Sequence, residues 1–462
     1  ANIVLHTLAA LMVLLILVRL VGDPLAAFFG AALFAVHPIQ VEAVAWCTGL
    51  PCNVSGLFMF VSLWLYLRYA EAEERRDKIR LYVLATLAFL AAVLSKPTAT
   101  VQPVFVGVVA FYLLRRPLLQ VVKEMAPWLL LAAPLMFITK SLEPDSMLAF
   151  VPALWQRVLI MGDTLTFYVS KVIVPAGLSI DYGRTPQFVL GQAWFYATGL
   201  APFLLALLLW RKYSKPWIWA ALGVFVVGLG PVLGLIPFGH QEISTVADRY
   251  LYPSMLGPAL LVAWGLKGQR RRPVLGIASL VLVMLAGIAF FQTHNWSTSR
   301  RLLVHALEVN PDSSLAHVNL GALLARRGKD DAARRHLKRA VELRPHDVKA
   351  HFNLGVLHAR NGRLQQSAAS YQAALKLNPN KVAAHKNLAI VLHRMKQFDL
   401  AIKHYRAALK LSPADPVLHN NLGVALEQVG KIPEAVASYM RALKLRPGYQ
   451  NPDRALNRLN KE

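Results

Sequence analysis

Long apolar segments, separated by short polar and mostly basic stretches, fill the first 295 residues of the chain. A helix of about 20 apolar residues is long enough to cross a hydrocarbon core of about 30 Å. Ten segments approach that length, at about 3–20, 24–40, 53–68, 81–95, 99–114, 126–140, 191–210, 216–236, 251–266 and 274–293. The pattern predicts a polytopic α-helical membrane domain of about ten spans over residues 1–295.

From residue 296 the pattern changes to shorter amphipathic segments that repeat every 34 residues. The repeat is marked by five prolines, Pro311, Pro345, Pro379, Pro413 and Pro447, and by the small residues Gly321, Gly355, Ala389 and Gly423. A 34-residue period is typical of tetratricopeptide (TPR) repeats, in which paired helices stack into a solenoid. We therefore predict an all-α protein with a half repeat at 297–311, four full repeats within 296–450, and a capping segment at 451–462.

Clusters of Lys and Arg follow every second predicted span, the first of them around residues 68–80. Because basic loops stay in the cytoplasm, the other loops are expected on the outer side, with everything after residue 294. This places the TPR arm in the periplasm of a bacterial inner membrane, or in a lumen of a eukaryote. The stretch 157–176 is expected to be an interfacial or re-entrant helix. Since residue 1 is Ala, we also expect natural sequence upstream of it.

The formal net charge of +25 would suggest nucleic-acid binding in a soluble protein. Here the basic residues fall in predicted cytoplasmic loops and over the surfaces of the TPR helices, so we predict no nucleic-acid partner. The two cysteines, Cys47 and Cys52, are expected to be unpaired buried thiols, with a disulfide as the alternative in an oxidising compartment. We predict neither a metal site nor a cofactor.

Several ionisable residues gather on the predicted outer face, where they are functional candidates because charge near a membrane is costly. His37 and Glu42 lie in one loop, and Lys96, Lys171 and Arg249 in three others, near Asp248 and Tyr182. Cations of this kind can bind a phosphate, and a carboxylate can act as a base toward a hydroxyl. In the structural alternative, Lys96 and Arg249 reach lipid phosphates, Asp248 pairs with Arg249, and His37 caps a helix.

Four stretches resemble bacterial TPR membrane proteins related to the transmembrane and TPR-repeat-containing O-mannosyltransferases. They are FAVHPIQVEAVAW (34–46), LSKP (94–97), ADRYLYPSMLG (247–257) and NWSTSRRLLVHALEVNP (295–311). The resemblance implies a glycosyltransferase of the GT-C type, which moves a sugar from a polyprenyl-phosphate donor to protein hydroxyls. It implies catalytic roles for Glu42 and His37, and donor-phosphate binding by Lys96, Arg249 and Lys171.

The chain departs from that family at two places. It begins at what resembles the second span, after the acidic outer loop of the family, and Leu50 and Cys52 stand where the family carries a charged pair. The alternative hypothesis is therefore a non-catalytic, membrane-anchored TPR scaffold that docks a protein partner within a larger membrane assembly.

The concave face of the TPR array is the predicted protein- or peptide-binding groove. Its candidate residues share one register in each repeat and comprise Asn319, Asn353, Asn387 and Asn421, followed seven residues later by Arg326, Arg360 and Arg394. Asn amides can bond an extended peptide backbone, and Arg can bind carboxylates. His317, His351, His385 and His419 repeat in the same way, and we interpret them as packing residues and not as metal ligands.

Overall fold

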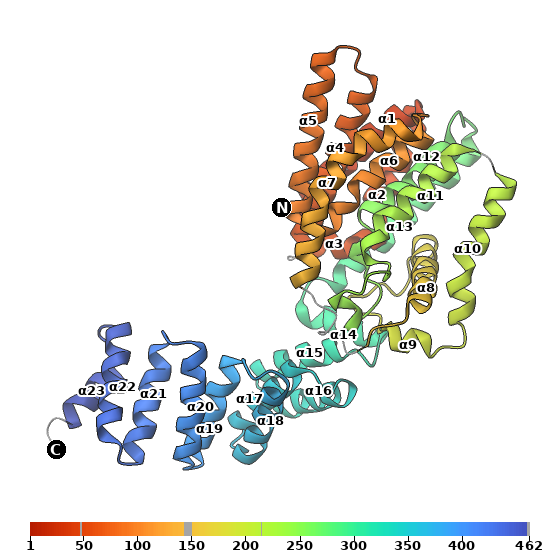
Figure 1. Ribbon diagram of the computed structural model, residues 1–462. Coiled ribbons are helices and arrows are strands. Elements are labelled where there is room, and N and C mark those ends of the chain that lie inside the picture. The colour runs from red at the N-terminus through yellow and green to blue at the C-terminus, as the bar shows by residue number, and fades with distance from the viewer. Residues whose placement is uncertain (47–48, 143–149, 214, 460–462) are drawn as a thin grey trace. The chain divides into compact units, whose positions relative to one another are not determined.

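The computed structural model describes residues 1–46, 49–142, 150–213 and 215–459, and the described chain is helical throughout, with no strand (Figure 1). It forms two compact units, Ala1–Pro311 and Asp312–Glu462. The all-α prediction and the C-terminal repeat region are confirmed.

The helices of the first unit are joined by short turns and several one-turn 3₁₀ helices. They are α1 (Asn2–Val21), α2 (Pro24–Val36), α3 (Val41–Ala45), α4 (Leu50–Glu71), α5 (Arg75–Ser95), α6 (Gln102–Tyr112), α7 (Leu118–Leu142), α8 (Leu154–Ile173), α9 (Pro186–Leu190), α10 (Phe195–Lys212), α11 (Pro216–Leu229), α12 (Leu256–Leu266), α13 (Arg272–Asn295) and α14 (Ser299–Val309).

Five helices are long and apolar enough to cross a membrane, namely α1, α4, α5, α7 and α13, or six if α2 and the bent segment Pro38–Ala45 count as one span. The sequence prediction of about ten spans is too high. Proline is the main physical reason, because it breaks helices inside apolar runs. The run 99–114 is divided at Pro103 between a 3₁₀ turn and an 11-residue helix, and the run 251–266 begins with two 3₁₀ turns around Pro253.

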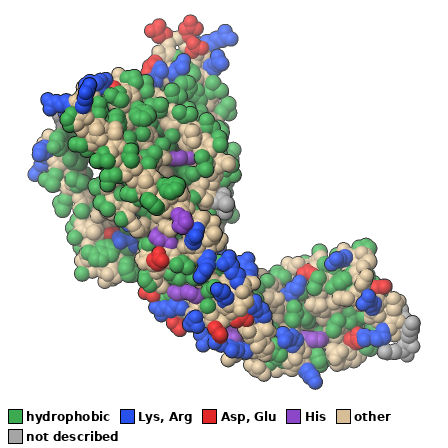
Figure 2. All heavy atoms as spheres, turned by 180° about the vertical axis from the view of Figure 1, so that it is seen from behind, with side chains coloured by type: hydrophobic (Ala, Val, Ile, Leu, Met, Phe, Trp, Pro, Cys, Tyr) green, Lys and Arg blue, Asp and Glu red, His purple; other side chains and the backbone are tan. Residues whose placement is uncertain are grey.

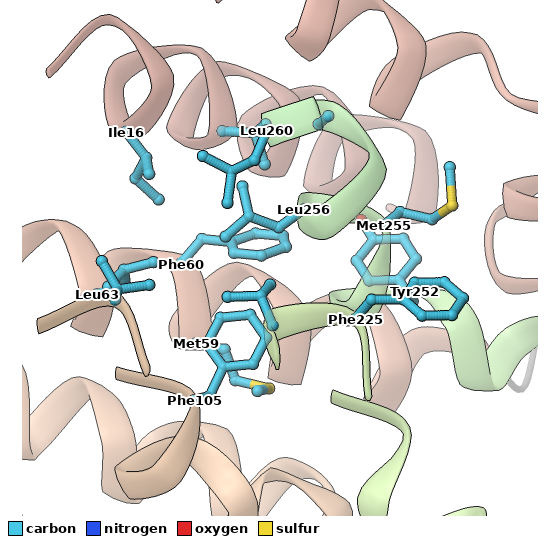
Figure 3. Close-up of a cluster of buried hydrophobic side chains, with 14 of the residues drawn as sticks. Ile16, Met59, Phe60, Leu63, Phe105, Phe225, Tyr252, Met255, Leu256 and Leu260 are labelled. Atoms are coloured by element: carbon cyan, nitrogen blue, oxygen red, sulfur yellow. The ribbon is translucent and has the colours of Figure 1, made fainter. Parts of the chain in front are cut away.

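The core of the first unit lies where α1, α4, α6, α11 and α12 meet (Figure 3). Figure 3 shows Phe60, Leu256 and Leu260 pointing toward one another, beside Phe105 and Phe225. Outside this core, hydrophobic side chains cover much of the face seen in Figure 2, and α13 is almost entirely uncovered. Such a surface suits a hydrocarbon environment better than water.

The second unit consists of four helix pairs and a final helix. The pairs are α15 (Ser314–Arg326) with α16 (Asp330–Leu343), α17 (Val348–Arg360) with α18 (Leu364–Leu377), α19 (Val382–Arg394) with α20 (Phe398–Leu411), and α21 (Pro416–Gln428) with α22 (Ile432–Leu445), followed by α23 (Gln450–Leu459). Gly355 shows why small residues recur, because a Cβ there would lie 2.8 Å from the ring of Tyr371. The helices of a pair can therefore approach closely.

The half repeat predicted at 297–311 forms α14, and this helix packs within the first unit. The Nε2 atom of His305 lies 3.0 Å from the carbonyl oxygen of Leu178, which also accepts a 2.9 Å bond from the side chain of Gln292 on α13. The division between the two compact units consequently falls after Pro311, whereas the sequence analysis placed its boundary after residue 295.

Candidate functional site

A buried ion pair joins two segments that are 207 residues apart in the sequence. Glu42 lies on α3, just after the turn η1 (Pro38–Gln40), and Arg249 lies on η7 (Asp248–Leu251). The Nη1 atom of Arg249 is 2.6 Å from Oε1 of Glu42, and the backbone N–H of Arg249 donates to Oε2 at 2.8 Å. Both carboxylate oxygens are thus engaged, and the Glu42 side chain is only 1% exposed.

Aromatic rings and a histidine surround the guanidinium of Arg249. Its Cζ atom lies 5.2 Å from the ring centre of Trp46 and 5.0 Å from that of Tyr250, within the range of cation–π contacts. Its Nη2 atom is 3.4 Å from Nε2 of His240. Burial, followed by the charge of Arg249, lowers the pKa of His240 to about 4, so this imidazole is neutral at neutral pH.

A second buried carboxyl group, that of Asp248, lies next to Arg249 in the chain but has a different partner. Its Oδ1 atom accepts a 2.7 Å hydrogen bond from the hydroxyl of Tyr182. Burial, and then the negative charge of Glu42, raise the pKa of Asp248 well above its usual range. A carboxyl group with a raised pKa can exchange a proton near neutral pH, as general acid–base chemistry requires.

Lys96 follows α5 and reaches the same region from another direction. Its Nζ atom is 3.0 Å from Sγ of Cys52 and 5.6 Å from the ring centre of Tyr250. Lys96, Arg249 and Tyr250 line a cavity of about 20 Å³, room for about one water molecule. Cys52 is a buried free thiol, and Cys47 lies outside the described residues, so their pairing stays a prediction.

Lys171 and His37 both lie against the C-terminal end of α8. The Nζ atom of Lys171 donates to the carbonyl of Ala176 at 2.5 Å and lies 5.5 Å from the ring centre of Tyr182, the residue that binds Asp248. Burial lowers the pKa of Lys171. His37 uses one ring nitrogen on the backbone N–H of Ile39 and the other on the carbonyl of Val172. Both nitrogens of His37 therefore have structural partners.

The structure brings most of the sequence candidates into one connected region. Glu42, Lys96 and Arg249 meet around Tyr250, and Lys171 joins them through Tyr182 and Asp248. Sequence reasoning missed His240, which carried no signal in its local pattern. It also noticed Asp248 only as a presumed partner of Arg249, whereas Arg249 pairs with Glu42.

The candidate groove residues of the repeats lie on the first helix of each pair. Asn319 donates to the carbonyl of Leu315 in its own helix, and Asn387 donates to the hydroxyl of Tyr371 at 3.3 Å. The side chain of Asn421 accepts a 3.1 Å bond from Asn420. Only part of the Asn series therefore has contacts that tie it to a neighbouring helix.

The Arg series contacts the preceding repeat. Arg360 donates to the carbonyl of Ala325 and forms an ion pair with Asp330, and Arg394 donates to the carbonyl of Ala359 at 3.3 Å. These carbonyls lie at the C-terminal ends of α15 and α17, where helices have unsatisfied acceptors. Arg360 and Arg394 thus cap helices, whether or not they also meet a ligand.

The repeated histidines make hydrogen bonds beyond the expected packing. Nε2 of His351, His385 and His419 lies 2.9–3.0 Å from the carbonyl of the proline six residues earlier in the chain. His385 also meets His404 with 3.0 Å between the Nδ1 atoms. Because the ring donates from Nε2, Nδ1 of neutral His385 is the acceptor in this pair. Among the described residues, no group of three or more His, Cys, Asp or Glu side chains could hold a metal ion.

Comparison with known proteins identifies the repeats. The tetratricopeptide-repeat family matches residues 284–347, 328–381, 352–416 and 387–450. The C-terminal part is a TPR region.

The chain is also similar to a curated protein O-mannosyl-transferase of Caenorhabditis elegans. The two are 23% identical over 317 residues, which make up 65% of this chain and 44% of that protein. The chain thus spans less than half the length of this relative. The similarity is a distant relationship to a TPR-containing O-mannosyl-transferase.

Similar solved structures match about a third of the chain. A crystal structure of MamA is 25% identical, covers 32% of this chain and 85% of MamA, and has a TM-score of 0.31. YrrB, described as a TPR protein with an unusual peptide-binding site, is 17% identical, covers 34% of this chain and 81% of YrrB, and has a TM-score of 0.32.

Proposed function

We propose that the protein is a membrane-embedded, GT-C-like glycosyltransferase that transfers a sugar from a polyprenyl-phosphate donor to an exported protein. The observation that carries the proposal is the buried group of Glu42, Arg249, Asp248 and Tyr182 with Lys96 beside it. Such a concentration of buried charge is costly in an apolar helical unit and is typical of functional sites. The distant similarity to an O-mannosyl-transferase supports the same chemistry.

In the proposed reaction, an acceptor hydroxyl attacks the anomeric carbon of the sugar, and the bond from that carbon to the phosphate oxygen breaks. Asp248 accepts the hydroxyl proton, because its raised pKa suits proton transfer. Polyprenyl phosphate leaves, and its negative charge is stabilised by Arg249 and Lys96, with Lys171 as a further cation. The lipid donor is the second substrate, and the proposal needs neither a metal nor a cofactor.

Glu42 receives a different role from the catalytic one implied by the family resemblance. Both of its oxygens accept hydrogen bonds from Arg249, so neither is directed at a substrate. We therefore assign Glu42 as a positioning residue for Arg249, and His37 as a residue that holds the end of α8.

The TPR region is proposed to bind the acceptor as an extended segment of a protein, in the periplasm of a bacterial inner membrane. Asn353 and Asn387, at equivalent positions of neighbouring repeats, would bond the backbone of that segment. Exchanging both for Ala should weaken peptide binding without unfolding the repeats. Unchanged binding of acceptor peptides to the double variant would refute the groove.

The decisive experiment compares protein glycosylation in a deletion strain complemented with the wild-type gene, with Asp248→Asn or with Asp163→Asn. Asp163 is a matched control, because its carboxylate is also buried and ion-paired, 2.6 Å from Arg184, outside the proposed site. Asp248→Asn should reduce transfer at least about 100-fold, and Asp163→Asn should affect only protein level. Glycosylation that is unchanged in the deletion strain, or retained by Asp248→Asn, would reject the enzyme.

The second candidate function is a non-catalytic scaffold that docks a protein partner in a membrane assembly. One observation favours it: the cavity beside Lys96 and Arg249 has a volume of about 20 Å³, too small for a sugar without side-chain movement. A stoichiometric folded partner recovered with the full-length protein, together with normal glycosylation in the deletion strain, would support the scaffold.

A further inference from the structure

A cavity of about 640 Å³ lies in the first unit, apart from the region around Arg249. Its wall is formed by α1, by the end of α2 and the following turn, by α3 and by α13. The volume is within the range of small-molecule sites, about 300–1,000 Å³. It shares no lining residue with the small cavity beside Lys96, so it is a separate space.

Gln40 is an unsatisfied polar group in the wall of this cavity. Its side chain belongs to a residue that is 2% exposed, and neither Nε2 nor Oε1 has a hydrogen-bond partner. Buried amides are rarely left unpaired in folded proteins. The other polar side chains of the wall are largely satisfied within the protein. His6 contacts Tyr252 and Ala35, and Asn2 donates to the carbonyl of Trp46. Gln40 alone therefore presents both a free donor and a free acceptor.

The wall has no charged side chain among the described residues that line it. An anionic head group would be buried there without a cation, which is unfavourable. An extended peptide would bring a donor and an acceptor with every residue, more than Gln40 can satisfy. A neutral molecule with a single hydroxyl-type group suits the wall better than either.

The apolar part of such a ligand has room along α13. A second cavity of about 310 Å³ follows the same seam between α2 and α13, and it is lined only by Gly, Ala, Val, Leu and Phe side chains. The first cavity contacts Ala35 and Ala289, and the second contacts Leu33 and Leu282, so both lie along these two helices. The seam can accommodate an apolar tail that starts near Gln40.

We propose that this cavity binds a neutral, single-chain amphiphile such as a monoacylglycerol, with a hydroxyl group on Gln40 and the acyl tail along the α2–α13 seam. The hydroxyl donates to Oε1 and accepts from Nε2, which satisfies both atoms. The proposal is independent of the glycosyltransferase function and concerns a ligand without phosphate.

The test uses the full-length protein in lipid nanodiscs and a monoacylglycerol with a diazirine in its acyl chain as the photoprobe. Labelling should saturate, map to α2 and α13, and be competed by unlabelled monoacylglycerol but not by the fatty acid of the same chain. Gln40→Leu should weaken the apparent affinity about three- to tenfold, the effect of one or two lost hydrogen bonds. Ala289→Trp, which fills the cavity, should abolish saturable labelling.

Gln102→Leu is the matched control, because Gln102 is also fully buried and its Nε2 donates to Met59 outside the cavity. It should leave labelling unchanged, which separates loss of the ligand from loss of the fold. The proposal is overturned if labelling never saturates, if the fatty acid competes equally, or if Gln40→Leu labels like wild type. Absence of labelling, as when another protein segment fills the cavity, also overturns it.

Discussion

Exchanging Glu42 for Gln should destabilise the first unit strongly, and the contacts of the carboxylate give the size of the effect. Both partners of Glu42, the guanidinium and the backbone N–H of Arg249, are hydrogen-bond donors. A Gln amide has one acceptor oxygen, so its NH₂ group would face one of these donors. Removing one member of a buried pair typically costs about 3–5 kcal/mol, because the other charge is left uncompensated.

A double-mutant cycle isolates the ion pair from the other contacts of the two residues. Arg249→Met alone should cost a similar amount, since it strands the Glu42 carboxylate. The combination with Glu42→Gln keeps the bond to the backbone N–H and leaves no buried charge, so we expect a favourable coupling of about 2–3 kcal/mol. The measurement is equilibrium unfolding in detergent micelles, followed by tryptophan fluorescence, to which Trp46 beside Arg249 contributes.

The pair Arg19–Glu71 serves as the control for this cycle. Its side chains are 29% and 50% exposed, and exposed pairs contribute about 0–1 kcal/mol. Its coupling should therefore be small. Additive effects of Glu42→Gln and Arg249→Met, within about 0.5 kcal/mol, would refute the reasoning that the buried charge pair dominates this region.

Three further predictions concern single positions. Lys396 has a φ of 60° where the other repeats have Gly, so Lys396→Gly should stabilise the repeats by up to about 1 kcal/mol, measured by chemical unfolding. Burial, and then His385, lower the pKa of His404 to about 4. The unfolded chain therefore binds more protons as the pH falls from about 6.5 to about 4, and stability is lost over that window. His404→Ser should reduce the loss by about 1–2 kcal/mol for a half-buried group, seen as a smaller fall in Tm between pH 7 and pH 5. Gly162→Ala places a Cβ 1.9 Å from the carbonyl oxygen of Gly199 and should destabilise the α8–α10 packing, whereas Gly276→Ala, with open space around it, should not; equal melting temperatures would contradict this.

The repeats were predictable from sequence because their pattern is local and recurs. The grid that starts a repeat at residue 314 agrees with the start of α15 at Ser314, and the small residues lie where the paired helices meet. The spans were less predictable, because hydropathy measures the length of an apolar run and not the length of its helix. Pro103 and Pro253 fall inside such runs and shorten the helices there.

The region around Arg249 was predictable as a group of residues but not as a set of contacts. Loop charges indicated that Glu42, Lys96 and Arg249 share one side of the membrane. No pattern in the sequence could pair Glu42 with a residue 207 positions away. The alternative pairing of Asp248 with Arg249 rested on adjacency, but neighbouring residues of a helical turn point in different directions. The tertiary fold, through Tyr182, decided the partner of Asp248.

The membership of α14 in the first unit has a consequence for how the repeats can be exchanged. The imidazole of His305 and the amide of Gln292 both lie against the carbonyl of Leu178, which begins the loop that carries Tyr182. Modular swaps of TPR arrays between proteins should therefore be joined after Pro311, where the second compact unit starts. A graft joined at residue 296 would remove a helix that supports this loop, and would transfer an orphan helix to its new host.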